Sequence, residues 1–279
     1  MKKLYIIIML GIIGLSANAQ RFYADAGLGW GFNAASSSFG ENISNTPLNY
    51  SLVKGSLGKG FPFGLKFGFM FNENISAELG IGYFIGSEIT MTSTRDPQTY
   101  YYSVETSSYK ASMVRVMPGV KLTSGNKIKP YAKFGFAIGI FGNIIFNNDA
   151  TGALIVSQTY KYSGNLAMGY YGAFGIEYHL TDKISLFAEV MSINQSWAPG
   201  HSIITKYNMN GINQLASMPT SQKEIDYVNT ITSADTTRNG NIPSKELKQY
   251  YPMSSLAINV GIHFTFGKVM TYPETPEKH

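Results

Sequence analysis

The feature that most constrains the fold is a period-two alternation of apolar residues with small or polar ones. It recurs in segments of about ten residues, where glycine, small, polar or single charged residues stand between the apolar positions. Successive side chains of a β-strand point to opposite faces, so each segment predicts a strand with one apolar face. The segments are residues 22–32, 61–71, 75–86, 113–122, 132–140, 166–179, 184–192 and 256–266.

The composition indicates where these apolar faces lie. Charged residues make up only 14% of the chain, which holds 29 Gly, 19 Tyr and 17 Phe, whereas soluble domains carry about 25% charged residues. Glycines with isolated charges suit the narrow interior of a small barrel, and in hydrocarbon every strand edge has to pair. The sequence therefore predicts an all-β fold: a closed eight-stranded antiparallel up-and-down transmembrane β-barrel.

The links between the segments alternate strictly in length. Such alternation is typical of outer-membrane barrels, which have short periplasmic turns and long outer loops. We expect some long links to continue as hairpins, with turns at 95–97 and 147–149, and the last to contain a short helix. The short links are 72–74, 124–129 and 181–183, and the four long ones are about 33–60, 87–110, 143–163 and 195–253.

The two ends of the chain differ from the barrel pattern. Lys2 and Lys3 precede a short apolar run, and Ala17 and Ala19 form a small-x-small cleavage pattern, so residues 1–19 are expected to be a signal peptide. We expect the barrel to occupy 20–267 and a short periplasmic tail to follow at 268–279. The chain has no cysteine, which excludes a disulfide framework, a thiol-ligated metal and a lipidated cysteine.

Three short motifs carry a family resemblance: Phe264-Thr265-Phe266 ending the last segment, Pro130-Tyr131 opening the fifth, and Phe187-Ala188-Glu189 in the seventh. Together they resemble the small OmpA/OmpX-type outer-membrane barrel family, including Bacteroidota members described as an outer membrane protein beta-barrel domain. The resemblance implies an outer-membrane location, contact with outer-membrane lipid and lipopolysaccharide, and recognition of the last strand by barrel-assembly machinery. OmpA-like proteins often add a peptidoglycan-binding domain, and without one a wall-tethering role is not expected.

The alternation places eight charged residues on the inner face of the barrel. Their signs are mixed, and buried charges have to pair because an isolated one is costly. They predict either an interior salt-bridge plug that fixes the strand register, which the small lumen of eight strands favours, or a narrow polar pore. The residues are Asp25, Lys66, Glu78, Arg115, Lys121, Lys133, Glu177 and Glu189.

Two histidines, His179 and His263, also fall on the inner face. They could bind a metal or sense pH, but they lie on strands that are not adjacent. We therefore expect two independently satisfied side chains.

The last long link contains a calcium-loop-like run. Asp235, Asn239, Gly240 and Glu246 match positions of an EF-hand loop, but Thr237 and Arg238 do not. The simpler interpretation is an Asn-Gly turn followed by a short helix that Ser244 caps, so we assign no metal site.

The same link holds His201, with Ser196, Ser202, Asp226 and Asp235 as candidate triad partners. No elbow motif or spacing supports a catalytic set, and we expect neither an enzyme nor a cofactor. There is also no tight basic cluster for nucleic acid.

A structural or surface-interaction role through the outer loops, with an extracellular ligand, is the first functional hypothesis, since loops on a rigid scaffold carry variable binding. The alternative is a narrow porin-like channel for small or hydrophobic solutes. A membrane-embedded lipid hydrolase or acyltransferase is the third.

Overall fold

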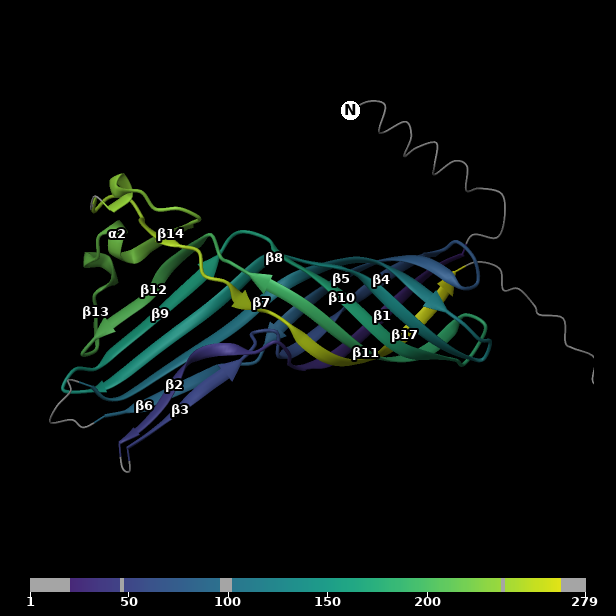
Figure 1. Ribbon diagram of the computed structural model, residues 1–279, viewed down its shortest axis with the longest axis horizontal. Helices are drawn as coiled ribbons and strands as arrows, with labels where there is room; N and C mark the ends of the chain where they lie inside the picture. Colours follow the sequence, from purple (N-terminus) through teal and green to yellow (C-terminus); the bar gives the residue numbers. More distant parts are fainter. Residues whose placement is uncertain (1–20, 46–47, 96–101, 237–238, 267–279) are drawn as a thin grey trace, which may run out of the picture.

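The computed structural model describes residues 21–45, 48–95, 102–236 and 239–266. The expected signal peptide and tail lie outside the described residues, as does most of the expected turn at 95–97. Within the described residues, eight strands form the closed barrel seen at the right of Figure 1. They are β1 (Arg21–Asn33), β4 (Gly60–Met70), β5 (Ile75–Gly86), β7 (Tyr102–Thr123), β8 (Ile128–Gly152), β10 (Ala167–His179), β11 (Ile184–Trp197) and β17 (Ser255–Phe266).

Each barrel strand pairs antiparallel with the next along the chain. The ring closes because β17 also pairs with β1, from Phe22 opposite Phe266 to Asn33 opposite Ser255. This closed antiparallel ring confirms the predicted fold class, and the alternating segments mark its strands.

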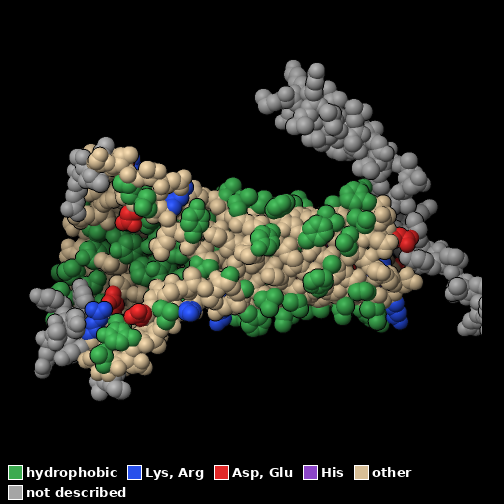
Figure 2. All heavy atoms as spheres, viewed as in Figure 1, with side chains coloured by type: hydrophobic (Ala, Val, Ile, Leu, Met, Phe, Trp, Pro, Cys, Tyr) green, Lys and Arg blue, Asp and Glu red, His purple; other side chains and the backbone are tan. Residues whose placement is uncertain are grey.

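The alternation divides the side chains between the two faces of the wall. Apolar side chains cover the outside of the barrel (Figure 2), where Leu28 is 51% exposed and Phe134 is 56% exposed. The intervening charged residues are buried inside, as Asp25 and Lys133 are. An exposed apolar belt with a polar interior is the arrangement expected of a barrel in lipid.

The four long links fold mainly as further strands at one end, called here the outer end. There β6 (Ile89–Thr94), the outer parts of β7 and β8, β9 (Val156–Ser163), β12 (His201–Met209), β14 (Glu224–Val228) and β15 (Ser244–Leu247) form one continuous raised sheet. The hairpin of β2 (Ser37–Asn45) and β3 (Leu48–Gly55) lies beside β6 (Figure 1) and pairs with it at one position. The remaining short strands are β13 (Ile212–Asn213) and β16 (Tyr251–Pro252).

The expected turn at 147–149 is wrong. Strand β8 runs on to Gly152, and β9 begins at Val156. The side chains of Asn147 and Asp149 accept hydrogen bonds from Thr159 and Ser157 on β9. Residues that often build turns are satisfied here across a strand pair.

The expected short helix is present, but at another place. Helix α2 (Thr220–Lys223) has four residues, and the segments η1 (Leu215–Ser217) and η2 (Ser233–Thr236) are 3-10 turns. Ser244 begins β15 and caps no helix. Among the described residues, no helix has the length and apolar character needed to span a membrane.

A buried apolar cluster, called here the mouth plug, closes the outer end of the barrel. Its members are Leu57, Phe84, Ala111, Met113, Ile144, Ala167, Trp197, Tyr251 and Met253.

Two link segments cross at the mouth plug. The amide of Leu57 donates to Pro252 O at 2.9 Å, and the amide of Met253 donates to Gln195 O at 2.9 Å. Ser56 Oγ donates to Ser254 O at 2.6 Å. Parts of two long links therefore fold into the mouth, and the apolar core sits there.

Candidate functional site

The structure places all eight predicted interior charges within the barrel. Seven are buried, and the side chain of Lys66 is 17% exposed. The set contains four acidic and four basic residues, so it is neutral when all are ionised. Opposite charges in such a small space are stabilised only when they are paired and hydrogen-bonded.

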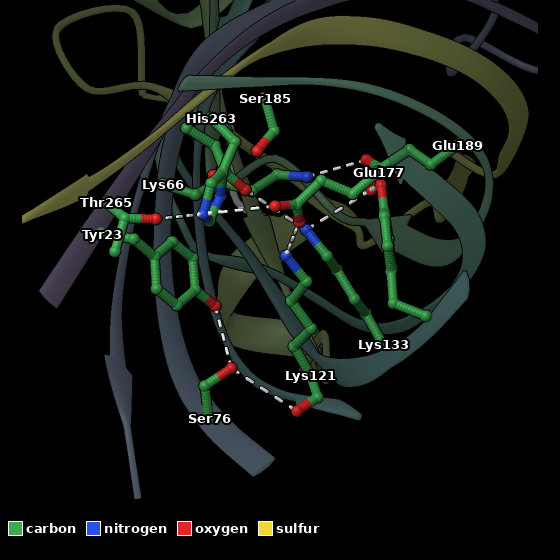
Figure 3. A network of polar contacts seen from close by, with 12 residues as sticks. Tyr23, Lys66, Ser76, Lys121, Lys133, Glu177, Ser185, Glu189, His263 and Thr265 are labelled. Atoms are coloured by element: carbon green, nitrogen blue, oxygen red, sulfur yellow. Dashed lines mark hydrogen bonds and ion pairs between the residues drawn. The ribbon is translucent and has the colours of Figure 1, made fainter. Parts of the chain in front are cut away.

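Lys133 lies at the centre of the largest group. Its Nζ is 3.1 Å from Glu78, 3.5 Å from Asp25 and 3.5 Å from Glu189. Glu189 also pairs with Lys66, at 2.7 Å. These side chains come from β8, β5, β1, β11 and β4 and meet inside the lumen, where Figure 3 shows Lys133, Glu189 and Lys66. We call this group the Lys133 network.

A second group lies toward the short turns. Lys121 Nζ is 2.9 Å from Glu177, and His263 Nδ1 is 2.6 Å from Asp25. Glu177 Oε1 is 3.4 Å from His263 Nε2 and 3.6 Å from His179 Nε2. The expectation of independently satisfied histidines is therefore wrong, because both rings lie near Glu177: His179 stands two positions along β10, and His263 reaches it from β17, beyond β11.

Uncharged polar side chains complete the Lys133 network. Tyr23 Oη donates to Glu78 at 2.7 Å, Tyr131 Oη donates to Glu189 at 3.0 Å, and Asn259 Nδ2 donates to Glu189 at 3.1 Å. Sequence reasoning did not single out these residues.

A signal for them was available in the sequence. Tyr23 stands two positions before Asp25, and Tyr131 stands two positions before Lys133. Residues separated by two share a face of a strand.

Arg115 contacts the mouth plug rather than the Lys133 network. Its Nε donates to Gln195 Oε1 at 3.1 Å, and its Nη2 donates to Met253 O at 3.2 Å. The guanidinium also lies 4.3 Å from the centre of the Phe84 ring, within the range of a cation–π contact. Arg115 therefore ties the barrel wall to the segment that closes the mouth.

Two small cavities lie along the barrel among the described residues. One, of about 70 Å³, is lined by Lys66, Glu189, Phe84 and Arg115 among others, and has room for roughly five water molecules. The other, of about 60 Å³, lies near the short turns. No residue lines both cavities, and Lys133 lines neither. The Lys133 network therefore separates them.

The calcium-loop-like run does not have an EF-hand arrangement. Asp235 Oδ2 accepts hydrogen bonds from Thr232 N and Oγ1, and its Oδ1 lies 2.5 Å from Lys245 Nζ. Glu246 lies in β15, and Thr237 and Arg238 lie outside the described residues. In the part of the chain that the structure describes, no group of three or more His, Asp and Glu could hold a metal ion.

The candidate triad is not assembled. His201 Nδ1 lies 2.8 Å from Asp226 Oδ1, in an exposed pair between β12 and β14. Ser202 hydrogen-bonds Tyr227 on the opposite face of the sheet, and Asp235 pairs with Lys245. The arrangement is that of a surface ion pair.

Comparison with protein families gives one match. The model of the family described as "Outer membrane protein beta-barrel domain" matches residues 6–213. No curated protein matches the chain.

Several solved structures are similar in arrangement, at low identity. Outer membrane protein OprG from Pseudomonas aeruginosa is 10% identical with a TM-score of 0.41, covering 91% of this chain and 99% of that one. Neisserial surface protein A is 10% identical with a TM-score of 0.36, covering 89% and 98%. The attachment invasion locus protein Ail of Yersinia pestis is 8% identical with a TM-score of 0.36, covering 90% and 100%.

Proposed function

Because this chain belongs to the outer membrane protein beta-barrel domain family, we propose that it is a non-conducting outer-membrane scaffold that presents its raised sheet for contacts outside the cell. In this proposal the apolar belt contacts outer-membrane lipid and lipopolysaccharide, and barrel-assembly machinery inserts the chain. We assign the scaffold no reaction. The predicted Bacteroidota origin stays a prediction.

The observation that carries the proposal is the position of Lys133. Its ammonium lies within 3.5 Å of three carboxylates contributed by β1, β5 and β11. An ion carried through the lumen would have to break these contacts, and breaking a buried ion pair leaves uncompensated charge. The mouth plug adds a second obstruction, so the two cavities do not form a solute-sized path.

The raised sheet supports the second half of the proposal. It continues the rigid barrel strands β7 and β8 beyond the apolar belt, so its side chains are held in fixed positions. Surfaces that a rigid scaffold positions are the usual places for binding. By contrast, the two cavities described above measure about 70 and 60 Å³.

The test is single-channel conductance of the refolded chain in a planar lipid bilayer. We expect no current steps from the wild type. We expect current steps when Glu78→Ala/Lys133→Ala, which removes an interior pair, is combined with Arg115→Met, which releases the segment that closes the mouth. Asp182→Ala/Lys183→Ala, a matched pair in an exposed turn, should stay silent. Discrete steps from the wild type would overturn the proposal in favour of the narrow channel.

A further inference from the structure

One face of the raised sheet carries a continuous group of aromatic side chains. Tyr109, Phe146 and Tyr160 are register neighbours on β7, β8 and β9, with ring centres 4.5 and 5.8 Å apart. Tyr162 stacks on Tyr227 at 6.1 Å. We call the face with these five residues and Tyr251 the outer cup.

The outer cup is open on the side away from the barrel. Tyr109 and Tyr162 pack against the mouth plug, which forms its floor. Tyr160 and Tyr227 keep part of their surface exposed. Figure 2 shows the hollow at this end, with hydrophobic side chains inside it. The floor is therefore rigid, and aromatic surface above it remains accessible.

Two acidic residues face the cup side, and Arg95 also lies there, since its Nε donates at 3.1 Å to Ser93 Oγ, opposite Glu105. Glu246 is the register partner of Tyr227, so it faces the outer cup, and its side chain is exposed. Within the described residues Glu246 makes no ion pair. Glu105 faces the same side farther along β7, where it accepts a hydrogen bond from Asn148 Nδ2 at 3.2 Å.

The lysines of these strands occupy the opposite face. Lys110 follows Tyr109, Lys161 lies between Tyr160 and Tyr162, and Lys245 precedes Glu246. Alternation along a strand sends each of these lysines to the opposite side. The separation leaves carboxylates and aromatic rings together on one face.

Tyrosine ionisation is consistent with this arrangement. Burial, followed by the charge of neighbouring groups that include Glu246, raises the pKa of Tyr160 and Tyr227 above the usual value. The hydroxyls therefore stay neutral near pH 7, and the rings remain uncharged beside the carboxylate.

We propose that the outer cup binds a basic peptide segment, with an arginine or lysine side chain seated on Tyr160 and Tyr227 beside Glu246. Electron-rich aromatic faces attract cations within about 6 Å, and an exposed carboxylate adds charge complementarity. A peptide fits better than a small cation because the aromatic rings extend over several strands beside Glu246, so residues on either side of the seated cation also contact them. This inference rests on the proposed function, since it names the partner of the raised sheet.

The test measures binding to the refolded full chain by isothermal titration calorimetry. The probes are a short arginine-rich synthetic peptide, the same peptide with glutamine at each arginine, and a neutral glucan oligosaccharide. We expect only the arginine peptide to bind, with affinity that falls as salt rises. Glu246→Gln should weaken it about tenfold, and Tyr160→Leu, which keeps an apolar side chain without the π face, by a similar factor.

Glu224→Gln is the matched control, because Glu224 lies on β14 at an opposite-face position beside Ile225. It should leave binding unchanged. The inference would be overturned if Glu246→Gln did not weaken binding, or if both glutamate variants lost the same affinity. Preference for the glucan, or no binding by a folded wild type, would also overturn it. A silent bilayer recording with no peptide binding would reject the peptide partner while leaving the non-conducting scaffold in place.

Discussion

Nζ of Lys133 lies 3.1 Å from Oε1 of Glu78, although their strands β8 and β5 are separated in the sheet by β7. The contact therefore passes over the intervening strand inside the lumen rather than joining neighbouring strands. Asp25 and Glu189 reach the same ammonium from β1 and β11. One cation thus joins distant parts of the wall.

Lys133→Met is expected to destabilise the folded barrel by about 3–5 kcal/mol, because it leaves buried carboxylates without their cation. Urea-dependent unfolding in detergent micelles or lipid vesicles measures the change. Lys183→Met, in an exposed turn, should change stability little. Equal effects of the two substitutions would contradict the importance of the network. Adding Glu78→Gln to Lys133→Met should recover part of the loss.

Gly68→Ala is expected to destabilise the barrel by about 1–3 kcal/mol, the usual cost of forcing extra atoms into packed space. A Cβ at Gly68 would overlap the ring of Tyr23, whose hydroxyl belongs to the Lys133 network. Gly172→Ala is the control, since the nearest atom to a Cβ there is 3.8 Å away. Heat-modifiable gel mobility compares the two, and tolerance of both would show that Tyr23 moves freely.

Arg115→Met is expected to loosen the segment that closes the mouth while the barrel stays folded. The substitution keeps an apolar stem beside Phe84 but removes the hydrogen bonds to Gln195 and Met253 O. Hydrogen exchange of residues 251–254 should accelerate, because local opening becomes easier. Lys110→Met, on the outer part of the same strand, should not accelerate it. Unchanged exchange in Arg115→Met would mean that apolar packing alone holds the plug.

Raising the pH above about 10 should destabilise the outer cup. Burial raises the pKa of Tyr162 and Tyr109 above the unfolded value of about 10. The folded form then binds more protons than the unfolded form above that pH, so stability is fully present below pH ~10 and falls as pH rises. Ultraviolet titration of the tyrosine phenolates measures these pKa values, and the Tyr162→Phe variant serves as the reference. Titration of all tyrosines near their ordinary pKa in a folded chain would contradict this.

The barrel could be predicted from the sequence because lipid and lumen impose opposite demands on alternate residues. Leu28 and Gly27 illustrate this. Leu28 faces the outside of the barrel, whereas Gly27, the residue before it, lies against the inward ring of Phe187. The number and order of strands then followed from the segments and their links. Strands β1 and β4, which follow each other among the barrel strands, pair antiparallel as this pattern implies.

The contacts across the lumen could not be predicted in this way. Period-two alternation says that Glu177 and His263 point inward, but the strand tilt and stagger decide which inward residues meet. The hairpin arms β6 and β9 were expected within the long links, but their joining with β12, β14 and β15 into one raised sheet was not, for another reason. Its faces meet water, other strands and the β2–β3 hairpin, so residues such as Asn147 and Thr159 lack a clean apolar and polar alternation.

The pairing of Phe22 with Phe266 has a consequence for how the chain reaches its native state. The first and last strands form the final seam, so the ring cannot close until nearly the whole polypeptide has been made. Contacts between such distant residues form slowly, since chain entropy must be lost before they contribute. Until then both β1 and β17 expose an unpaired edge able to join a foreign strand. Assembly of this protein therefore requires that two open edges be kept from other chains until they find each other.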